Sequence, residues 1–348
     1  MTSSNKNAVG CNECAFKLDC GGLEDEASSL WGYFTECVVQ SKLTVCDMTC
    51  PNNPQLFSDR MRELEGNFRL TSKALKTLVR SLPAYIPKIH NGSGRIQQLS
   101  EKIVVVPIHE LLTKSGANIS CRFTSAEEVR QFFRLSAKTD YIITCISVDA
   151  DVEMVWEGLK YQGLSESIAR LKPVAVITPN FSFFIQDVPR THTIYNRKRI
   201  HMAARYLSDS GCRVILPLSA GNRNDWEIWY RFLIENPKMK YVAKEFQTGL
   251  KNPELALQAI QDLSKIQDLL MRPIHPIAFG GEKYSPILKK HFDNFTVIDS
   301  RAFMTAVNRR AISYPLGKYS ERFSPTAPGE SIDLLLDANI KEKRARYD

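Results

Sequence analysis

Short apolar runs rich in β-branched residues alternate with helical patterns along the chain from about residue 100 onward. The helical stretches have apolar residues three and four positions apart, with Asn224 and Asn252 as expected N-caps and Gly211 as an expected C-terminal stop. Buried strands separated by helices favour a parallel sheet. Seven strands are expected, at "IVVVP" (103–107), "YIITCIS" (141–147), "VAVIT" (174–178), "RVILPL" (213–218), "YVAKEF" (241–246), "PIAFGG" (276–281) and "FTVID" (295–299).

These strands, with an eighth in "AYIPKI" or "NISCRF", predict an α/β fold of the TIM-like (β/α)8 barrel type. The alternative is an open doubly wound sheet, which usually has a glycine-rich phosphate loop after its first strand; no G-x-G-x-x-G or Walker sequence occurs here. The expected domains are a Cys-rich module at 1–55, a helical linker at 56–100, the barrel at 101–325 and a C-terminal tail at 326–348.

Six of the nine cysteines lie in the first fifty residues. They include a C-x2-C pair, a C-x5-C step followed by two glycines, and a C-x3-C pair followed by proline. Such loops present thiolates to one metal ion or cluster, so zinc and an iron–sulfur cluster are both expected cofactors. The alternative is that some of these thiols are simply buried. The expected ligands are Cys11, Cys14, Cys20, Cys37, Cys46 and Cys50.

Composition and hydropathy predict a globular protein with no membrane partner. Of the 348 residues, 43% are hydrophobic and 24% are charged, and the longest apolar runs are too short to cross a bilayer. The N-terminal "MTSSNKNAVG" lacks the apolar core of a signal peptide, so the expected location is the cytoplasm, where thiols stay reduced.

Polar residues follow nearly every expected strand. Active sites of β/α barrels are built at the carboxyl ends of the strands, so these residues are the candidate site. The alternative for individual residues is a local role: Asp149, Asp151 or Asp299 as a helix cap, and His109 as a satisfied core or surface imidazole. The expected catalytic residues are Asp299, Glu245 and Asp149, and the expected substrate-binding residues are Asn180, Ser182, Gln247, Thr248, Gly280 and Gly281.

The stretch at 174–218, "VAVITPNFSFFIQDVPRTHTIYNRKRIHMAARYLSDSGCRVILPL", resembles an uncharacterised family of bacterial and phage proteins. That family has a TPDFS motif, a DMP or DVP turn, and a helix bearing N-x-x-R. The resemblance covers roughly residues 140–300 and implies no particular chemistry. This chain has Asn180 where the family usually has an aspartate.

A more distant similarity is carried by "HPIAFGGEKYSPILKKHFDNFTVIDSRAFMTAVNRR" at 275–310. It resembles the late barrel of the tRNA-guanine transglycosylase superfamily, whose members exchange guanine for a deazaguanine in tRNA or DNA. The resemblance implies that Asp299 is the nucleophile and that "KEFQTG" (244–249) is the base-contacting strand end. The family's Asp-Ser-Gly-Gly-Phe motif and its C-terminal zinc site are both missing here.

The net charge of +8 is compatible with a nucleic-acid partner, tRNA or DNA. Basic residues gather beside Tyr195 and His201, and we expect Arg197, Lys198 and Arg199 to form a nucleic-acid-binding surface. The alternative is a solvated helix face.

Two functions are therefore expected from the sequence. The first is a transglycosylase-like enzyme acting on a nucleic-acid base, with Asp299 as the nucleophile. The second is a non-catalytic, metal-stapled module of a phage or mobile-element system that binds nucleic acid or protein. A shared pocket for Asp299, Glu245 and Asp149 or Asp151 would favour the enzyme, whereas separate caps and salt bridges would favour the binding module.

Overall fold

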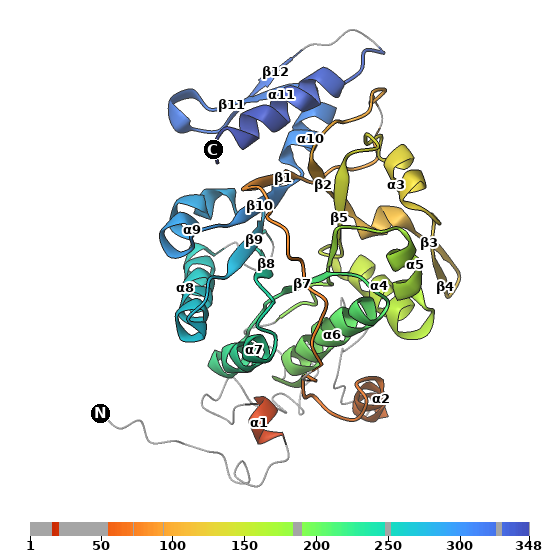
Figure 1. Ribbon diagram of the computed structural model, residues 1–348, viewed down its shortest axis with the longest axis vertical. Helices are drawn as coiled ribbons and strands as arrows, with labels where there is room; N and C mark the ends of the chain where they lie inside the picture. The colour runs from red at the N-terminus through yellow and green to blue at the C-terminus, as the bar shows by residue number, and fades with distance from the viewer. Residues whose placement is uncertain are drawn as a thin grey trace, which may run out of the picture. The chain divides into compact units, whose positions relative to one another are not determined.

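Eight parallel strands form a nearly closed barrel in the computed structural model of the chain (Figure 1). The structure describes residues 16–20, 55–71, 73–92, 94–183, 190–247, 252–324 and 329–347. The strands are β1 (Tyr85–Pro87), β2 (Ile103–Pro107), β5 (Asp140–Thr144), β6 (Ala175–Ile177), β7 (Val214–Pro217), β8 (Tyr241–Glu245), β9 (His275–Phe279) and β10 (Thr296–Asp299).

The strand order β1-β10-β9-β8-β7-β6-β5-β2 is a barrel opened between its first and second strands. A parallel bridge between Lys88 and Val105, with a 2.8 Å hydrogen bond from the Ile89 amide to the Val105 carbonyl, joins these two strands near their carboxyl ends. The predicted eight-stranded parallel barrel is confirmed, and its first strand is the "AYIPKI" segment. The barrel therefore begins inside the stretch for which the sequence predicted a helical linker.

Helices alternate with the strands along the chain, as expected (Figure 1). Asn252 caps α8 through the amide of Glu254, which confirms that prediction, whereas the cap of α7 is Asn222 rather than Asn224. The helices between strands are α3 (Ala126–Phe132), α4 (Asp149–Tyr161), α5 (Leu164–Arg170), α6 (Arg190–Asp209), α7 (Arg223–Glu235), α8 (Pro253–Leu270) and α9 (Ser285–His291).

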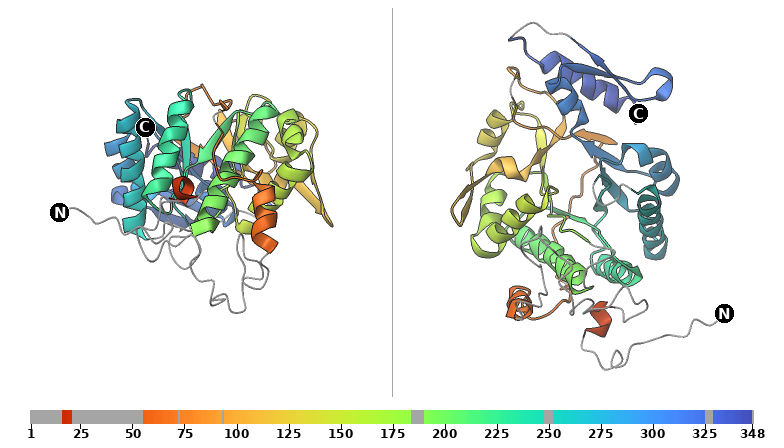
Figure 2. Two further views of the ribbon diagram at one scale, coloured as in Figure 1. Left: turned by 90° about the horizontal axis from the view of Figure 1, so that it is seen from below. Right: turned by 180° about the vertical axis from the view of Figure 1, so that it is seen from behind.

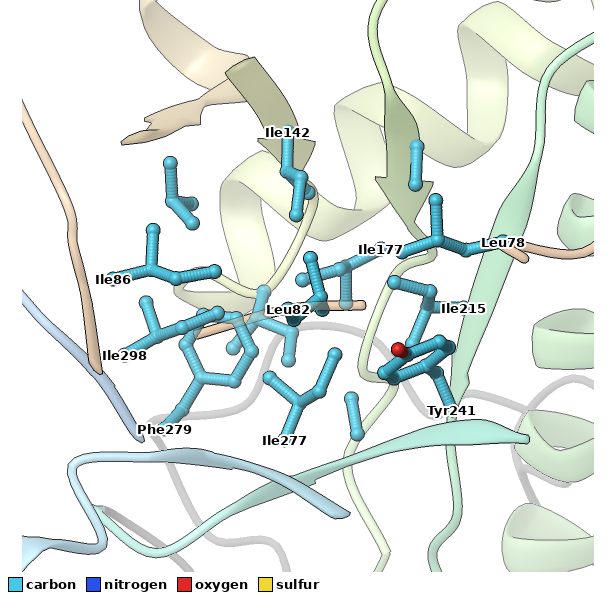
Figure 3. Close-up of a cluster of buried hydrophobic side chains, with 14 of the residues drawn as sticks. Leu78, Leu82, Ile86, Ile142, Ile177, Ile215, Tyr241, Ile277, Phe279 and Ile298 are labelled. Carbon is cyan, nitrogen blue, oxygen red and sulfur yellow. The ribbon is translucent and has the colours of Figure 1, made fainter. Parts of the chain in front are cut away.

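The barrel interior is filled by aliphatic and aromatic side chains from all eight strands (Figure 3). Ile142, Ile215 and Ile277 are fully buried and point toward one another across the barrel. Leu78 and Leu82, which precede β1, belong to the same cluster. Burial of each such side chain contributes about 1.5–3 kcal/mol, so the interior is a packed core that leaves chemistry to the strand ends.

Two helices and a hairpin follow the last barrel strand and pack together (Figure 2). These are α10 (Arg301–Val307), the hairpin of β11 (Arg310–Ser313) and β12 (Ser320–Phe323), and α11 (Asp333–Arg344). The Asn339 side chain joins α11 to β11, because it accepts the Ile312 amide at 2.7 Å and donates to the Arg310 carbonyl at 3.0 Å. The segment expected as a C-terminal tail therefore contains a packed helix.

The contacts divide the chain into two compact units. The larger unit contains Leu75–Asn180, Ala203–Pro217 and Pro237–Asp348, and so includes the whole barrel sheet. The smaller unit contains the described residues of Met1–Ala74, Phe181–Met202 and Leu218–Asn236, with the short helices α1 (Lys17–Cys20) and α2 (Gln55–Glu63). In the described part of the chain, every helix is too short or too polar to span a bilayer.

Candidate functional site

Charged and polar side chains converge at the carboxyl ends of four neighbouring strands of the larger unit. Residues that directly follow β1, β2, β5 and β6 lie close together, because parallel strands all end on the same face of a barrel. We call this group the mouth cluster; it consists of Lys88, His90, His109, Glu110, Ser147, Asp151 and Asn180.

Glu110 links the ends of β1 and β2. Its Oε1 lies 2.7 Å from Nδ1 of His90, and its Oε2 accepts the backbone amide of Asn91, also at 2.7 Å. Glu110 belongs to a short 3-10 turn, Ile108–Leu111, that begins directly after β2. The turn aims the carboxylate at the segment after β1, and both oxygens are thereby fixed.

His109 lies between Glu110 and Asp151. Its Nδ1 is 3.4 Å from Oδ2 of Asp151, and its Nε2 is 3.9 Å from Oε1 of Glu110. The ring is about one-third exposed, so solvent reaches it. Burial lowers the pKa of His109 below its usual value, and Lys88 acts in the same direction, while Asp151 and Glu110 oppose the shift.

A chain of hydrogen bonds fixes Asp151. The Ser147 hydroxyl donates to Oδ2 of Asp151 at 2.5 Å, and the Ser147 amide donates to Oδ1 of Asn180 at 3.1 Å. Asp151 lies in the first turn of α4, where a carboxylate also interacts favourably with the helix dipole. Residues after β5 and β6 therefore orient the carboxylate that faces His109.

Lys88 follows β1 at the seam where the barrel closes. Burial lowers the pKa of its ammonium group, against the opposing charges of Glu110 and Asp151. Neither carboxylate lies within ion-pair distance of the Lys88 ammonium in the described part of the chain; Glu110 and Asp151 contact the two histidines instead. The mouth cluster thus holds one lysine close to two carboxylates without pairing it directly to either.

Asp299 lies at the end of β10 but faces away from the barrel interior. Its neighbour Ile298 points into the core, and successive strand residues point to opposite faces. Oδ1 of Asp299 accepts the Tyr85 hydroxyl at 3.3 Å and the Arg301 amide at 3.0 Å, and Oδ2 pairs with Lys343 at 2.8 Å. Both oxygens of the predicted nucleophile therefore have protein partners outside the mouth cluster.

Lys343 also joins Asp299 to Glu282. Its ammonium lies 2.5 Å from Oε2 of Glu282, whose Oε1 accepts the Tyr314 hydroxyl at 2.7 Å. Burial alone would raise the pKa of Glu282, but Lys343 and Tyr314 lower it overall. Burial and the Asp299 carboxylate raise the pKa of Tyr85 well above its usual value.

The predicted catalytic residue Glu245, at the end of β8, lies beside predicted substrate-binding residues that follow β8 and β9. Glu245 accepts the Gln247 amide, and the Gln247 side chain covers Gly280, where an added Cβ would lie 2.2 Å from its Cγ. The Gln247 side chain thus occupies the space beside Gly280, which the sequence predicted as a substrate-binding residue. Gly281 lies against Phe246 and Ala278.

Three other predicted site residues, Asn180, Asp149 and Ser182, have other partners or surroundings. Asn180 belongs to the mouth cluster through its bond to Ser147. Asp149 is exposed in the first turn of α4, and the carbonyl of Ser182 accepts the side-chain amide of Asn196 at 2.6 Å in the smaller unit. Thr248 lies outside the described residues.

The predicted basic surface is buried in the smaller unit. Arg197, Lys198 and Arg199 are 0%, 1% and 2% exposed, although the sequence predicted a solvent-facing stripe. Arg197 and Arg190 form ion pairs with the fully buried Asp225. Burial would raise the pKa of this aspartate, but the two guanidinium groups hold it below its usual value. Their role in nucleic-acid binding stays a prediction.

The other two basic side chains also have protein partners. Lys198 donates to Oδ1 of Asn67 at 3.3 Å and to the Arg69 carbonyl. The guanidinium of Arg199 lies 4.0 Å from the ring centroid of Phe181 and 4.4 Å from that of Tyr195. The run of basic residues, which suggested an exposed surface, could not reveal these aromatic and carbonyl partners.

Of the expected cysteine ligands, Cys11, Cys14, Cys37, Cys46 and Cys50 lie outside the described residues, and Cys20 is buried at the end of α1. Asn224 holds this short helix to α7 by donating to the Asp19 carbonyl at 3.1 Å. Burial raises the pKa of Cys212 to about 11 and that of Cys145 further still. Such thiols are poor nucleophiles.

Sequence reasoning named Asp151, His109 and Asn180 but missed Lys88, His90 and Glu110. The available signal was the position of these residues directly after "YIP" and "IVVVP". It was missed because the first strand was assigned only as one of two alternatives.

Comparison with known protein families finds no family that matches the chain, and no curated protein is similar in sequence.

Proposed function

We propose that the chain is a barrel enzyme that acts at the mouth cluster, and that its reaction is a glycosyl transfer on a nucleic-acid base, as in guanine exchange. The observation that supports an enzyme is the convergence of one lysine, two histidines and two carboxylates from three successive strands, β1, β2 and β5. Active sites of this fold lie at this end of the barrel, where catalytic residues come from the ends of several different strands. The reaction class rests on the resemblance at 275–310.

The charges of the mouth cluster suit this reaction class. Positive charge develops on the sugar and negative charge on the departing base when a glycosidic bond breaks. Carboxylates stabilise the first charge, and an ammonium such as that of Lys88 stabilises the second. The cluster holds both signs within one partly buried site.

Asp299 is the nucleophile that the resemblance implies, and its geometry supports a different role. Its two oxygens are held by Tyr85, Arg301 and Lys343, so an attack on a sugar carbon would first have to break these contacts. We therefore place the chemistry at the mouth cluster. Asp299 serves in this proposal to anchor α11.

The binding module is the second candidate, and one observation favours it. Asp299, Glu245 and Asp151 each have separate local partners in the larger unit. Separate partners are what we expect of carboxylates that act as caps and ion pairs. The enzyme is preferred because the mouth cluster supplies a charged site that does not depend on these three residues meeting.

Incorporation of labelled guanine into tRNA or duplex DNA tests the enzyme. We expect the wild-type chain to incorporate label, Lys88→Met to lose about 100-fold or more in rate, and the exposed Lys138→Met control to keep its rate. Asp299→Asn should keep a measurable rate. Absence of exchange on both polymers would reject the reaction class, and loss of exchange only in Asp299→Asn would return the nucleophile to Asp299.

The N-terminal cysteines are proposed to bind zinc or an iron–sulfur cluster in the smaller unit. Four buried basic side chains, Arg190, Arg197, Lys198 and Arg199, and two buried carboxylates, Glu63 and Asp225, occur among its described residues. A metal centre with several thiolate ligands is anionic and would balance this excess of positive charge. Metal analysis of wild-type protein and of Cys11→Ser with Cys14→Ser tests the proposal, which fails if the wild-type protein contains no more metal than the variant.

A further inference from the structure

We propose that His90, His109 and Glu110 in the mouth cluster bind one divalent transition-metal ion such as zinc. Each residue offers one donor atom, and the three donor atoms lie within 4.8 Å of one another. Two imidazole nitrogens and one carboxylate oxygen are a common ligand set for catalytic zinc and for non-haem iron. This site is separate from the cysteine centre and does not depend on the proposed reaction.

The donor atoms already approach the required spacing. Nδ1 of His90 and Nε2 of His109 lie 2.7 Å and 3.9 Å from Oε1 of Glu110. Ligands bound at about 2.0–2.2 Å from one zinc ion are roughly 3–3.5 Å apart. Side-chain shifts of less than about 1 Å therefore convert the present contacts into a coordination sphere.

The residues around the three ligands hold them in a binding orientation. Asp151 lies on the Nδ1 side of His109, which directs Nε2 toward Glu110. The Asn91 amide holds the second oxygen of Glu110. Carboxylates and amides placed behind ligands in this way fix the histidine tautomer and raise ligand basicity. Ser147, which follows β5, donates a hydrogen bond to Asp151, so β5 also helps to position the ligand His109.

The charge balance also favours a cation. Glu110 and Asp151 outweigh Lys88, which is not paired with either carboxylate in the described part of the chain. The protein supplies three ligands to the ion, and two of them, Glu110 and His109, are partly exposed to solvent. A fourth position would thus be open to water or to a substrate, as in catalytic zinc sites.

The simpler reading is a hydrogen bond between His90 and Glu110 with no metal. The His90 ring also packs against Phe303, with centroids 5.6 Å apart, which would hold it without an ion. This reading leaves Nε2 of His109 3.9 Å from Oε1 of Glu110, which is too far for a hydrogen bond. A bound ion explains why Oε1 of Glu110 lies near one ring nitrogen of each histidine.

Cobalt(II) titration of the full chain distinguishes this site from the cysteine centre. Cobalt bound by thiolates gives a sulfur-to-metal charge-transfer band in the near ultraviolet, whereas a site of two histidines and one glutamate gives only visible ligand-field bands. We expect wild-type protein to bind one cobalt ion that has no charge-transfer band. His90→Gln combined with Glu110→Gln should lose this one equivalent and keep any thiolate band.

Two further variants keep the result interpretable. Asp151→Asn, which changes a positioning residue, should weaken cobalt binding at this site by about 10–100-fold and keep its stoichiometry. His291→Gln, a half-buried histidine on α9, should change neither. The proposal is overturned if wild type and the double variant, both folded by circular dichroism, bind the same number of ions without a thiolate band. Guanine exchange without such a metal would still support the proposed function.

Discussion

Lys343, near the C-terminal end of α11, forms a buried ion pair with Asp299 at the end of β10, with Nζ and Oδ2 2.8 Å apart. The lysine is 0% exposed and also contacts Glu282. One ammonium group is therefore shared by two carboxylates, that of Glu282 shortly after β9 and that of Asp299 at the end of β10. This places the C-terminal helix as a structural partner of the barrel and gives Asp299 a role that the sequence did not suggest.

Lys343→Met should destabilise the protein by about 3–5 kcal/mol, because it leaves the buried carboxylate of Asp299 without its cation and removes the same cation from the partly buried Glu282. Chemical denaturation monitored by circular dichroism measures the change. Lys341→Met is the matched control, since this exposed lysine on the same helix should cost no more than about 0.5 kcal/mol. Equal effects of the two substitutions would show that the ion pair contributes nothing.

Gly280→Ala should destabilise the protein through two separate effects. Gly280 has a φ of +65°, which costs an alanine about 1–2 kcal/mol, and the new Cβ would overlap the Gln247 side chain. Gln247→Ala should remove the overlap and recover part of the loss, leaving the backbone cost. A double-mutant cycle measures the coupling, and purely additive effects would contradict the contact.

His275 predicts a pH dependence of stability. The hydroxyl of Thr296 donates to the Pro83 carbonyl, so Nε2 of His275, 2.8 Å from that hydroxyl, carries the proton and donates. Burial lowers the pKa of His275 to about 4. Between pH 6.5 and 4 the unfolded chain binds the proton and the folded chain does not, so this contribution to stability is present above pH 6.5 and is lost on acidification.

The loss due to His275 should reach about 3 kcal/mol by pH 4, an order-of-magnitude figure. His275→Gln keeps an amide donor and should make the unfolding free energy less dependent on pH over this range. Burial also lowers the pKa of His192 to about 4, and His192 remains in the variant, so part of the pH dependence of the unfolding free energy should remain. An unchanged pH profile in the variant would show that His275 does not contribute.

The barrel was predictable because its signal is local. The run "IVVVP" reads as a buried strand from composition alone, and the structure finds all five residues of β2 buried. The site was less predictable because it depends on which way each strand end faces. Asp299 lies at a strand end as expected, but the side chain that points into the barrel is that of Ile298. A shift of one residue along a strand moves a side chain from the barrel interior to its outside.

Charge patterns were the weakest guide. Arg197 lies in a basic run that is typical of an exposed helix, but its partner Asp225 is 28 residues further along the chain. Long-range pairing of this kind leaves no periodic trace in the sequence. The same holds for Glu110 and His90, which come from different strand ends and meet only when the barrel closes.

Arg197→Met should lower the stability of the smaller unit by about 3–5 kcal/mol, because it removes one of two cations from the fully buried Asp225. Arg223→Met, on an exposed residue of α7 that pairs with Glu227 on the surface, is the control and should cost at most about 1 kcal/mol. Limited proteolysis and denaturant unfolding report the difference. If Arg197→Met is as stable as the control and instead reduces the dependence of nucleic-acid affinity on salt concentration, Arg197 contacts phosphate rather than Asp225.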